Sequence, residues 1–242
     1  MSDTDNVIHI MEEVNSHEKP SRRDRAKATR VTILRAAKEE FATAGYHGAT
    51  MASIAARAGV AVQTVHFVFH TKGELLGAVV DHSVEGEDSV PPPLSDWFIA
   101  AEAEPDARDA LRHFIRGSST IMAGASALND VVRAAARSDP DAEANFRRVE
   151  RLRTESYVKF LNSILAKGEL RADVDGAKAV DILLVMLSPR TYLGLVEDRG
   201  WTPEQAIDWL ADAVPGLIFA DTQPGGGTVP RRESGPNRRP HT

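Results

Sequence analysis

The chain has 242 residues, 42% of them hydrophobic and 26% charged, so it is long and apolar enough to bury a core. It contains no cysteine, which excludes a disulfide framework, a thiolate metal site and a cysteine nucleophile. The net charge is −6, but residues 21–82 carry +4 and residues 83–220 carry −8, so a basic segment suited to an anionic partner precedes an acidic body.

Both ends of the chain are polar, and no segment is long and apolar enough for a membrane. Residues 1–20 are acidic and lack the apolar core of a signal peptide. The longest apolar run, "AVDILLVML", is far shorter than the roughly 20 residues that span a bilayer. We therefore expect a cytoplasmic protein without membrane contact. The tails, residues 1–20 and the Gly-, Pro- and Arg-rich residues 221–242, are expected to be disordered.

Helical periodicity begins near Arg25 and continues to Gly45, which is expected to end the first helix. Thr50 is a good N-cap for a short second helix, and Gly59 is expected to break it. A third short helix is predicted over residues 61–69. Thr71 and a glutamate three positions later predict a capping box at the start of a fourth helix.

The remaining pattern is helical throughout and predicts an all-α fold. After a linker, "EGEDSVPPPLSD", helices are expected over residues 95–102, 106–122, 126–138, 140–167, 176–196 and 203–219. Residues 21–82 are expected to form an N-terminal three-helix domain of the helix-turn-helix type, joined to a larger helical domain over residues 83–220. The last helix places Ile207, Leu210, Val214 and Leu217 on one stripe, which predicts a two-fold interface in a homodimer.

The helix over residues 61–69 is unusually apolar for its length. In a three-helix bundle only one of its faces can be core, and Val65 and Phe69, four residues apart, are the expected core pair. Two short helices joined by a tight glycine turn form a helix-turn-helix, whose second helix enters the major groove of DNA. Outward apolar side chains can contact thymine methyl groups there, and Gln63 can pair with adenine.

The stretch "ILRAAKEEFATAGYHGATMASIAARAGVAVQTVHFVFHTKGELL" resembles the N-terminal domain of the tetracycline-repressor (TetR) family, with many matches at fixed spacing. The stretch "LSPRTYLGLVEDRGWTPEQAIDWLADAVPGLIF" resembles, more weakly, the two C-terminal dimerisation helices of that family. The resemblance implies a DNA-binding regulator whose acidic half holds a small hydrophobic effector. It also implies DNA contacts from Thr50, Met51, Ser53, Val62, Gln63, Thr64, His66, Phe67 and Lys72.

Three positions depart from the family pattern. Ala61 replaces the usual serine N-cap and loses about 1 kcal/mol of helix capping. His66 replaces a tyrosine that bonds a phosphate, and Val68 replaces a histidine or tyrosine that meets the DNA backbone. These departures keep an alternative open, a helical small-molecule-binding protein with weakened or lost operator binding. The leading interpretation is a dimeric repressor that a small hydrophobic effector releases from a palindromic operator.

Other patterns support weaker hypotheses. Arg22, Arg23, Arg25 and Lys27 are either an arm that reaches DNA or a solvated segment. No metal site, cofactor or enzymatic activity is expected, because no ligand cluster or catalytic signature stands out. Eight large apolar side chains are either plain core or the lining of an effector cavity: Trp97, Phe98, Phe114, Met122, Tyr157, Phe160, Met186 and Tyr192. Ser118, Asn162 and Arg190 either orient a ligand or merely pack.

Overall fold

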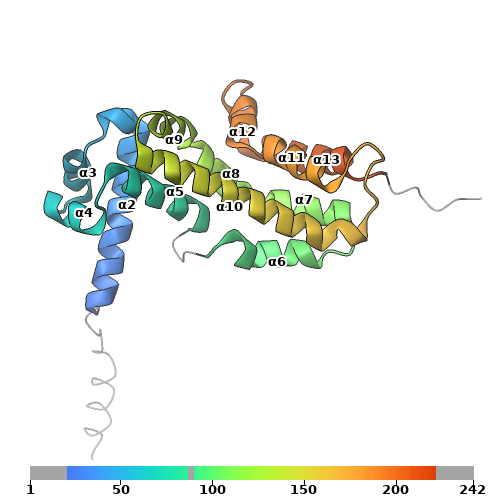
Figure 1. Cartoon of the computed structure of the whole chain (residues 1–242), viewed down its shortest axis with the longest axis horizontal. Helices are drawn as coiled ribbons and strands as arrows, with labels where there is room; N and C mark the ends of the chain where they lie inside the picture. The colour runs from blue at the N-terminus through green and yellow to red at the C-terminus, as the bar shows by residue number, and fades with distance from the viewer. Residues whose placement is uncertain (1–20, 87–89, 222–242) are drawn as a thin grey trace, which may run out of the picture.

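The computed structural model describes residues 21–86 and 90–221 and is helical, as the sequence predicts (Figure 1). Four helices form one end of the molecule: α2 (Arg22–Gly48), α3 (Met51–Ala58), α4 (Val62–Val68) and α5 (Lys72–Glu85). Over the described ranges, strand-type pairing is limited to one isolated bridge between Leu170 and Phe219. The predicted disordered tails lie outside the described residues, apart from Asp221.

The long α10 (Pro140–Ile164) runs through the rest of the molecule, from the α5 end to the opposite end (Figure 1). The body also contains α6 (Asp96–Ala103), α7 (Ala107–Gly117), α8 (Ser119–Ser126), α9 (Asn129–Ala136), α11 (Gly176–Met186), α12 (Pro189–Val196) and α13 (Pro203–Ile218). Of these, α6, α9 and α11 pack on α10, while α13 packs on α7 and α12 on α8. Short 3-10 turns, Pro92–Leu94 and Leu165–Lys167, precede α6 and follow α10. Among these residues no single helix is long and apolar enough to cross a membrane, although two bent pairs, α3 with α4 and α11 with α12, meet the length and composition required.

Two apolar cores hold this arrangement together. One core lies under the first four helices and contains Phe41, Ile54, Val65 and Phe69, all fully buried. It continues into the body through side chains of α9 and α10, so these four helices are packed against the body. The second core fills the body with a cluster of aromatic rings, in which Phe114 stacks on Phe160 with their ring centroids 4.1 Å apart.

The start and end of the first helix follow local chemistry. Ser21 caps α2 in a reciprocal capping box with Asp24, so the helix begins three residues before the predicted Arg25. Gly45 interrupts the helix as predicted, with a positive φ of 67°, and one further turn follows to Gly48. At α5 the capping box is only half formed. Thr71 accepts from the Glu74 N–H, but the Glu74 carboxylate accepts from the backbone N–H of His70 rather than from that of Thr71.

Three predicted helices in the body have different boundaries in the structure. The expected helix over 106–122 breaks at Ser118 into α7 and α8, and the expected helix over 126–138 shortens to α9. The expected helix over 176–196 is divided into α11 and α12 with a bend of 43°. The cause is Pro189, which has no N–H for a continuous helix and starts α12 instead, with Ser188 as its N-cap.

The predicted interface stripe on the last helix is wrong in three of its four residues. Ile207, Leu210 and Val214 are buried inside the same chain, where α13 packs against α7. Leu217 is 42% exposed. An amphipathic stripe shows which face of a helix is covered but not by what, and here the cover is intramolecular. A Leu210→Asp change would therefore disrupt the core of the chain rather than an interface.

Candidate DNA-binding surface and effector cavity

The α3–α4 pair has the geometry of a helix-turn-helix. The two helices are bent by 107° relative to one another, within the range of such motifs. Gly59 ends α3 in the left-handed region, with φ 67° and ψ 29°, which a residue with a side chain rarely adopts. The turn therefore depends on a glycine at this position.

The helix α4 divides its side chains as the sequence predicts. Val65 and Phe69 are fully buried, so they form the core pair. Gln63 and His66 are exposed, and Phe67 is 86% exposed. The other two predicted contact residues, Val62 and Thr64, are half-buried, and so is Val68. No side chain caps the helix at Ala61, in accord with the predicted loss of that contact.

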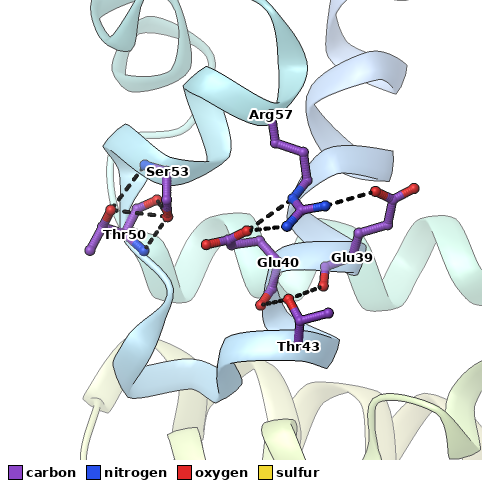
Figure 2. A network of polar contacts seen from close by, with 6 residues as sticks. All are labelled: Glu39, Glu40, Thr43, Thr50, Ser53 and Arg57. Atoms are coloured by element: carbon purple, nitrogen blue, oxygen red, sulfur yellow. Dashed lines mark hydrogen bonds and ion pairs between the residues drawn. The ribbon is translucent and has the colours of Figure 1, made fainter.

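The predicted contact residues of α3 gather at its N-terminus. Thr50 and Ser53 form a reciprocal capping box in which each hydroxyl accepts from the other residue's backbone N–H, at 3.0 Å in both directions. Figure 2 shows the two side chains turned toward one another. Met51 is half-buried and packs on the core below. The hydroxyls hold the helix start, so a phosphate at this point would meet the backbone N–H groups and would share the hydroxyl of Thr50.

An ion-pair network, which sequence reasoning missed, ties α3 to α2 (Figure 2). The Arg57 guanidinium pairs with Glu40 at 2.8 Å and with Glu39 at 3.3 Å. The Ser53 hydroxyl and the Arg57 guanidinium lower the pKa of the Glu40 carboxyl, so it stays ionised. Arg57 thus offsets part of the negative charge that would otherwise lie close to the expected DNA surface.

The structure gives Lys72 a contact that the sequence did not predict. Its ammonium donates to the carbonyl oxygens of Tyr46, at 2.7 Å, and Ala49, at 3.0 Å, and lies over the Tyr46 ring. These bonds fix the end of α2 against the start of α5. One of the three N–H groups of the ammonium remains for a phosphate.

A hydrogen bond joins this end of the molecule to α10. The Tyr46 hydroxyl donates to the Asp139 carboxylate, which also accepts from the first backbone N–H groups of α10. Burial, and then the bond to Asp139, raise the pKa of Tyr46, and the same bond lowers the pKa of Asp139. The phenol therefore stays protonated and the carboxylate ionised, so the contact persists across the neutral pH range.

The basic residues that precede the core are helical. Arg22, Arg23, Arg25 and Lys27 lie in the first turns of α2, and all are exposed. This part of α2 projects beyond the other helices (Figure 1). Arg30, one turn further on, covers the ring of Phe69 at 4.5 Å. The predicted arm is therefore a projecting helix end.

A cavity of about 390 Å³ lies in the body, between α5, α8 and α10. Four of the eight large apolar residues singled out in the sequence line it: Trp97, Phe114, Met122 and Tyr157. Ser118 also lines it, whereas Asn162 and Arg190 are exposed elsewhere. Arg153 lines it as well and was not predicted. An available sequence signal is its place four residues from both Val149 and Tyr157, which puts an arginine on an apolar face.

A second hollow, of about 540 Å³, lies between α2, α5 and α8. Its lining includes the cationic side chains Arg35 and Lys38, together with Gly86 and Val90. The smaller cavity has aromatic walls and lies within the body, so it is the candidate effector site.

Comparisons with known proteins agree with this geometry. The model of the tetR family of bacterial regulatory proteins matches residues 33–79, which comprise most of α2, all of α3 and α4, and the first half of α5. No curated protein matches the chain.

Many solved structures share the fold. NalD of Pseudomonas aeruginosa, the secondary repressor of the MexAB-OprM multidrug efflux pump, is 16% identical, with a TM-score of 0.64 over 81% of this chain and 100% of that one. FadR of Bacillus subtilis, solved with stearoyl-CoA, is 18% identical, with a TM-score of 0.62 over 78% and 99%. A regulator from Saccharomonospora viridis, solved with choline, is 18% identical, with a TM-score of 0.61 over 79% and 98%.

At these identities the solved structures show a common fold, and the family match falls on the helix-turn-helix itself. The two results agree with the division of α4 into a buried pair and an exposed face. Residues 33–79 thus match the tetR family of bacterial regulatory proteins, and the chain as a whole has the fold of the solved regulators named above.

Proposed function

We propose that the protein is a cytoplasmic, dimeric transcriptional repressor that binds a palindromic operator and releases it when a small effector fills the cavity in its body. Residues 21–82 are the operator-binding part and residues 83–220 the effector-binding and dimerisation part. The observation that carries the proposal is the exposed face of α4, where Phe67 is 86% exposed although it is one of the largest apolar side chains in the chain. Such a side chain on a helix-turn-helix is accounted for by a partner outside the chain.

The proposed DNA contacts are the nine residues of α3, α4 and the start of α5 that the family resemblance implies. Gln63 and Phe67 read bases, while Thr50, Ser53 and Lys72 meet the phosphate backbone, and Met51, Val62, Thr64 and His66 lie around them. Lys72 binds a phosphate through its one remaining N–H group, while its other two N–H groups hold the end of α2 against the start of α5. The charge of +4 over residues 21–82 supports a salt-dependent association, in which log affinity falls with log salt by about 0.9 per neutralised phosphate.

A homodimer would present two such motifs to DNA. Its proposed interface is the outer face of α11 and α13, where Val185, Trp209 and Leu217 are 63%, 42% and 42% exposed. Apolar side chains gathered on two adjacent helices favour burial against a second copy. The operator would then have two half-sites about one DNA turn apart.

Release would follow from the place of α5. Its first residue, Lys72, is bonded to the DNA-binding end, and Val80 and Val84 in its later turns line the cavity. A ligand that prefers the DNA-incompetent arrangement by about 10⁴-fold, or about 5.5 kcal/mol, would shift a two-state equilibrium almost completely. By reciprocity, operator DNA would weaken binding of that ligand by the same factor.

A gel-shift assay with DNA that flanks the protein's own gene tests the proposal. A repressor should bind one segment specifically, and the protein concentration that shifts half of this DNA should rise steeply with salt. Gln63→Ala should reduce the discrimination between bases at one base pair by about 1–3 kcal/mol. Failure to bind any flanking segment above a random duplex would instead favour the alternative, a ligand-binding protein whose operator binding is weakened or lost. The uncapped start of α4 at Ala61 is the observation that favours that alternative.

A further inference from the structure

The cavity contains a guanidinium group that the protein leaves partly unbonded. Arg153, on α10, donates from Nη2 to Glu150 at 2.8 Å. Its Nε and Nη1 atoms are buried and have no hydrogen-bond partner among the residues that the structure describes. Buried donors without an acceptor are rare because each costs free energy. An acceptor from outside the chain would remove that cost.

Two other charged groups of the lining, Asp81 and Lys159, have partners within the protein. Both oxygens of Asp81 accept from Arg148 Nη2, at 2.6 and 2.7 Å. Lys159 donates to the carbonyl oxygen of Pro93 at 3.3 Å. Lys159 is exposed, so solvent can satisfy its remaining donors, whereas the spare donors of Arg153 are buried.

The ion pair of Arg153 with Glu150 does not remove the attraction of Arg153 for an anion. The Glu150 side chain is 41% exposed, so solvent screens its charge, whereas the Arg153 side chain is 22% exposed. Tyr157 lies one helical turn further along the same face, and burial raises its pKa to about 12. Its hydroxyl keeps its proton at neutral pH and is available as a further donor near Arg153.

The rest of the wall is mostly apolar. It comes from α5, from α8, from the helix break before α12 and from the aromatic cluster, and includes Val80, Trp97, Phe114, Ile121, Met122 and Leu187. A cavity of about 390 Å³ with such walls suits the body of a small ligand. Donors at one side and apolar walls elsewhere define an amphipathic space.

We propose that the effector is an amphipathic anion, whose carboxylate or similar oxygen head accepts from the free N–H groups of Arg153 and whose apolar body fills the space between α5, α8 and α10. This inference rests on the proposed effector role of the cavity and adds the chemical class of the ligand. Charge-assisted hydrogen bonds to arginine are about twice as strong as neutral ones, so the head group sets the preference. A cationic head group would instead bind the carboxylates of the lining, and an amine probe would then bind more tightly than its carboxylate counterpart.

The test uses two matched series of probes on the full-length protein: decanoate, decanol and decylamine, and 4-phenylbutyrate, 4-phenylbutanol and 4-phenylbutylamine. Dissociation constants are measured by calorimetry at neutral pH. The carboxylate of at least one series should bind at least about tenfold more tightly than its alcohol. Equal affinity of acid and alcohol in both series, tighter binding of the amines, or no binding by any probe would each overturn the inference.

Two variants assign the preference to Arg153. Arg153→Met should remove the advantage of the carboxylate and leave the affinity of the alcohol within about threefold of the native value. Arg153→Lys, which keeps the charge but has fewer donors, should retain part of the advantage. The matched control is Arg147→Met on the same helix, whose side chain is 75% exposed and pairs with Glu143. If the control changes the preference as much as Arg153→Met, the assignment is wrong.

Operator binding is measured separately by fluorescence anisotropy without any probe. A protein that binds the carboxylate through Arg153 but no flanking DNA would contradict the proposed repressor and leave the ligand class intact. A protein that binds operator but shows no carboxylate preference would contradict only the ligand class.

Discussion

Two phenylalanines in α4, two residues apart, predict opposite consequences for the same substitution. Phe69 is fully buried in the core under the first helices, whereas Phe67 is 86% exposed. Phe69→Ala should lower the free energy of unfolding by about 3–5 kcal/mol, the usual cost of removing a buried phenyl ring. The cation–π contact of Arg30 with that ring, at 4.5 Å, places the cost toward the upper part of the range.

Phe67→Ala should change the free energy of unfolding by no more than about 0.5 kcal/mol, because the ring packs on little of the protein. Its effect should fall on DNA. If the ring contacts a thymine methyl group, the loss is about 1–3 kcal/mol for each half-site, or roughly 5- to 150-fold in affinity. Affinity for a random duplex, which depends on phosphate contacts, should stay unchanged.

Both variants are measured by thermal unfolding at one fixed protein concentration and by anisotropy with operator and random DNA. For a protein of this size, Phe69→Ala should lower the Tm by roughly 6–20 °C, and Phe67→Ala by less than about 2 °C. The reasoning is refuted if Phe67→Ala destabilises the fold as much as Phe69→Ala. It is also refuted if Phe67→Ala leaves specific binding intact, because an exposed phenylalanine then has no partner on DNA.

Three further predictions follow from other contacts. Trp209→Glu should convert the dimer to a monomer, as measured by light scattering at micromolar concentration. The control Ile99→Glu, at a 53% exposed side chain on α6, should leave the dimer intact. If the Trp209→Glu variant is still a dimer, the interface lies elsewhere. Lys72→Met should weaken specific and random DNA alike and also lower the Tm, because the ammonium bonds two backbone carbonyls; an unchanged Tm would show those bonds to be unimportant. The lowered pKa of Asp139 means that its contact with Tyr46 stabilises the fold fully above the ordinary aspartate pKa of about 3.9, and that this stability is lost as the pH falls through the lower folded pKa. Between pH 5 and pH 2, the free energy of unfolding of the native protein should therefore fall by more than that of the Tyr46→Phe variant, as measured by denaturant titrations; equal losses would show that the contact does not stabilise the fold.

The DNA-binding end is predictable from sequence because local chemistry determines it. Gly59 needs a positive φ, Thr50 caps the helix that follows it, and Val65 and Phe69 can face only one core. Each of these depends on residues within a turn or two along the chain. The positions of the proposed DNA contacts follow from the same local geometry, although their contacts with DNA remain predictions.

The body is less predictable because its features depend on which helices meet. The apolar run before Pro189 continues without a change of period, so it predicts one helix where the structure has two. The stripe of Ile207, Leu210 and Val214 requires a cover, and the sequence does not show whether α7 or a second copy supplies it. Arg153 is one of many arginines until the fold places it beside a cavity.

The contact between α5 and α10 suggests a route by which a ligand in the cavity would act on DNA binding. Near the DNA-binding end α5 and α10 pack closely at two glycines, because a Cβ on Gly73 would lie 2.7 Å from Asp141 Cβ, and one on Gly77 would lie 2.6 Å from Asn145 Cγ. Further along, both helices line the cavity, with Val80 on one and Arg153 on the other. Under the proposed function, a ligand that separated them there would meet resistance at the glycine contacts, so α5 would tilt about that point rather than move as a whole. Lys72 lies just beyond it and is bonded to the end of α2, so such a tilt would displace the helix-turn-helix, which in the proposed dimer has to match the spacing of a half-site.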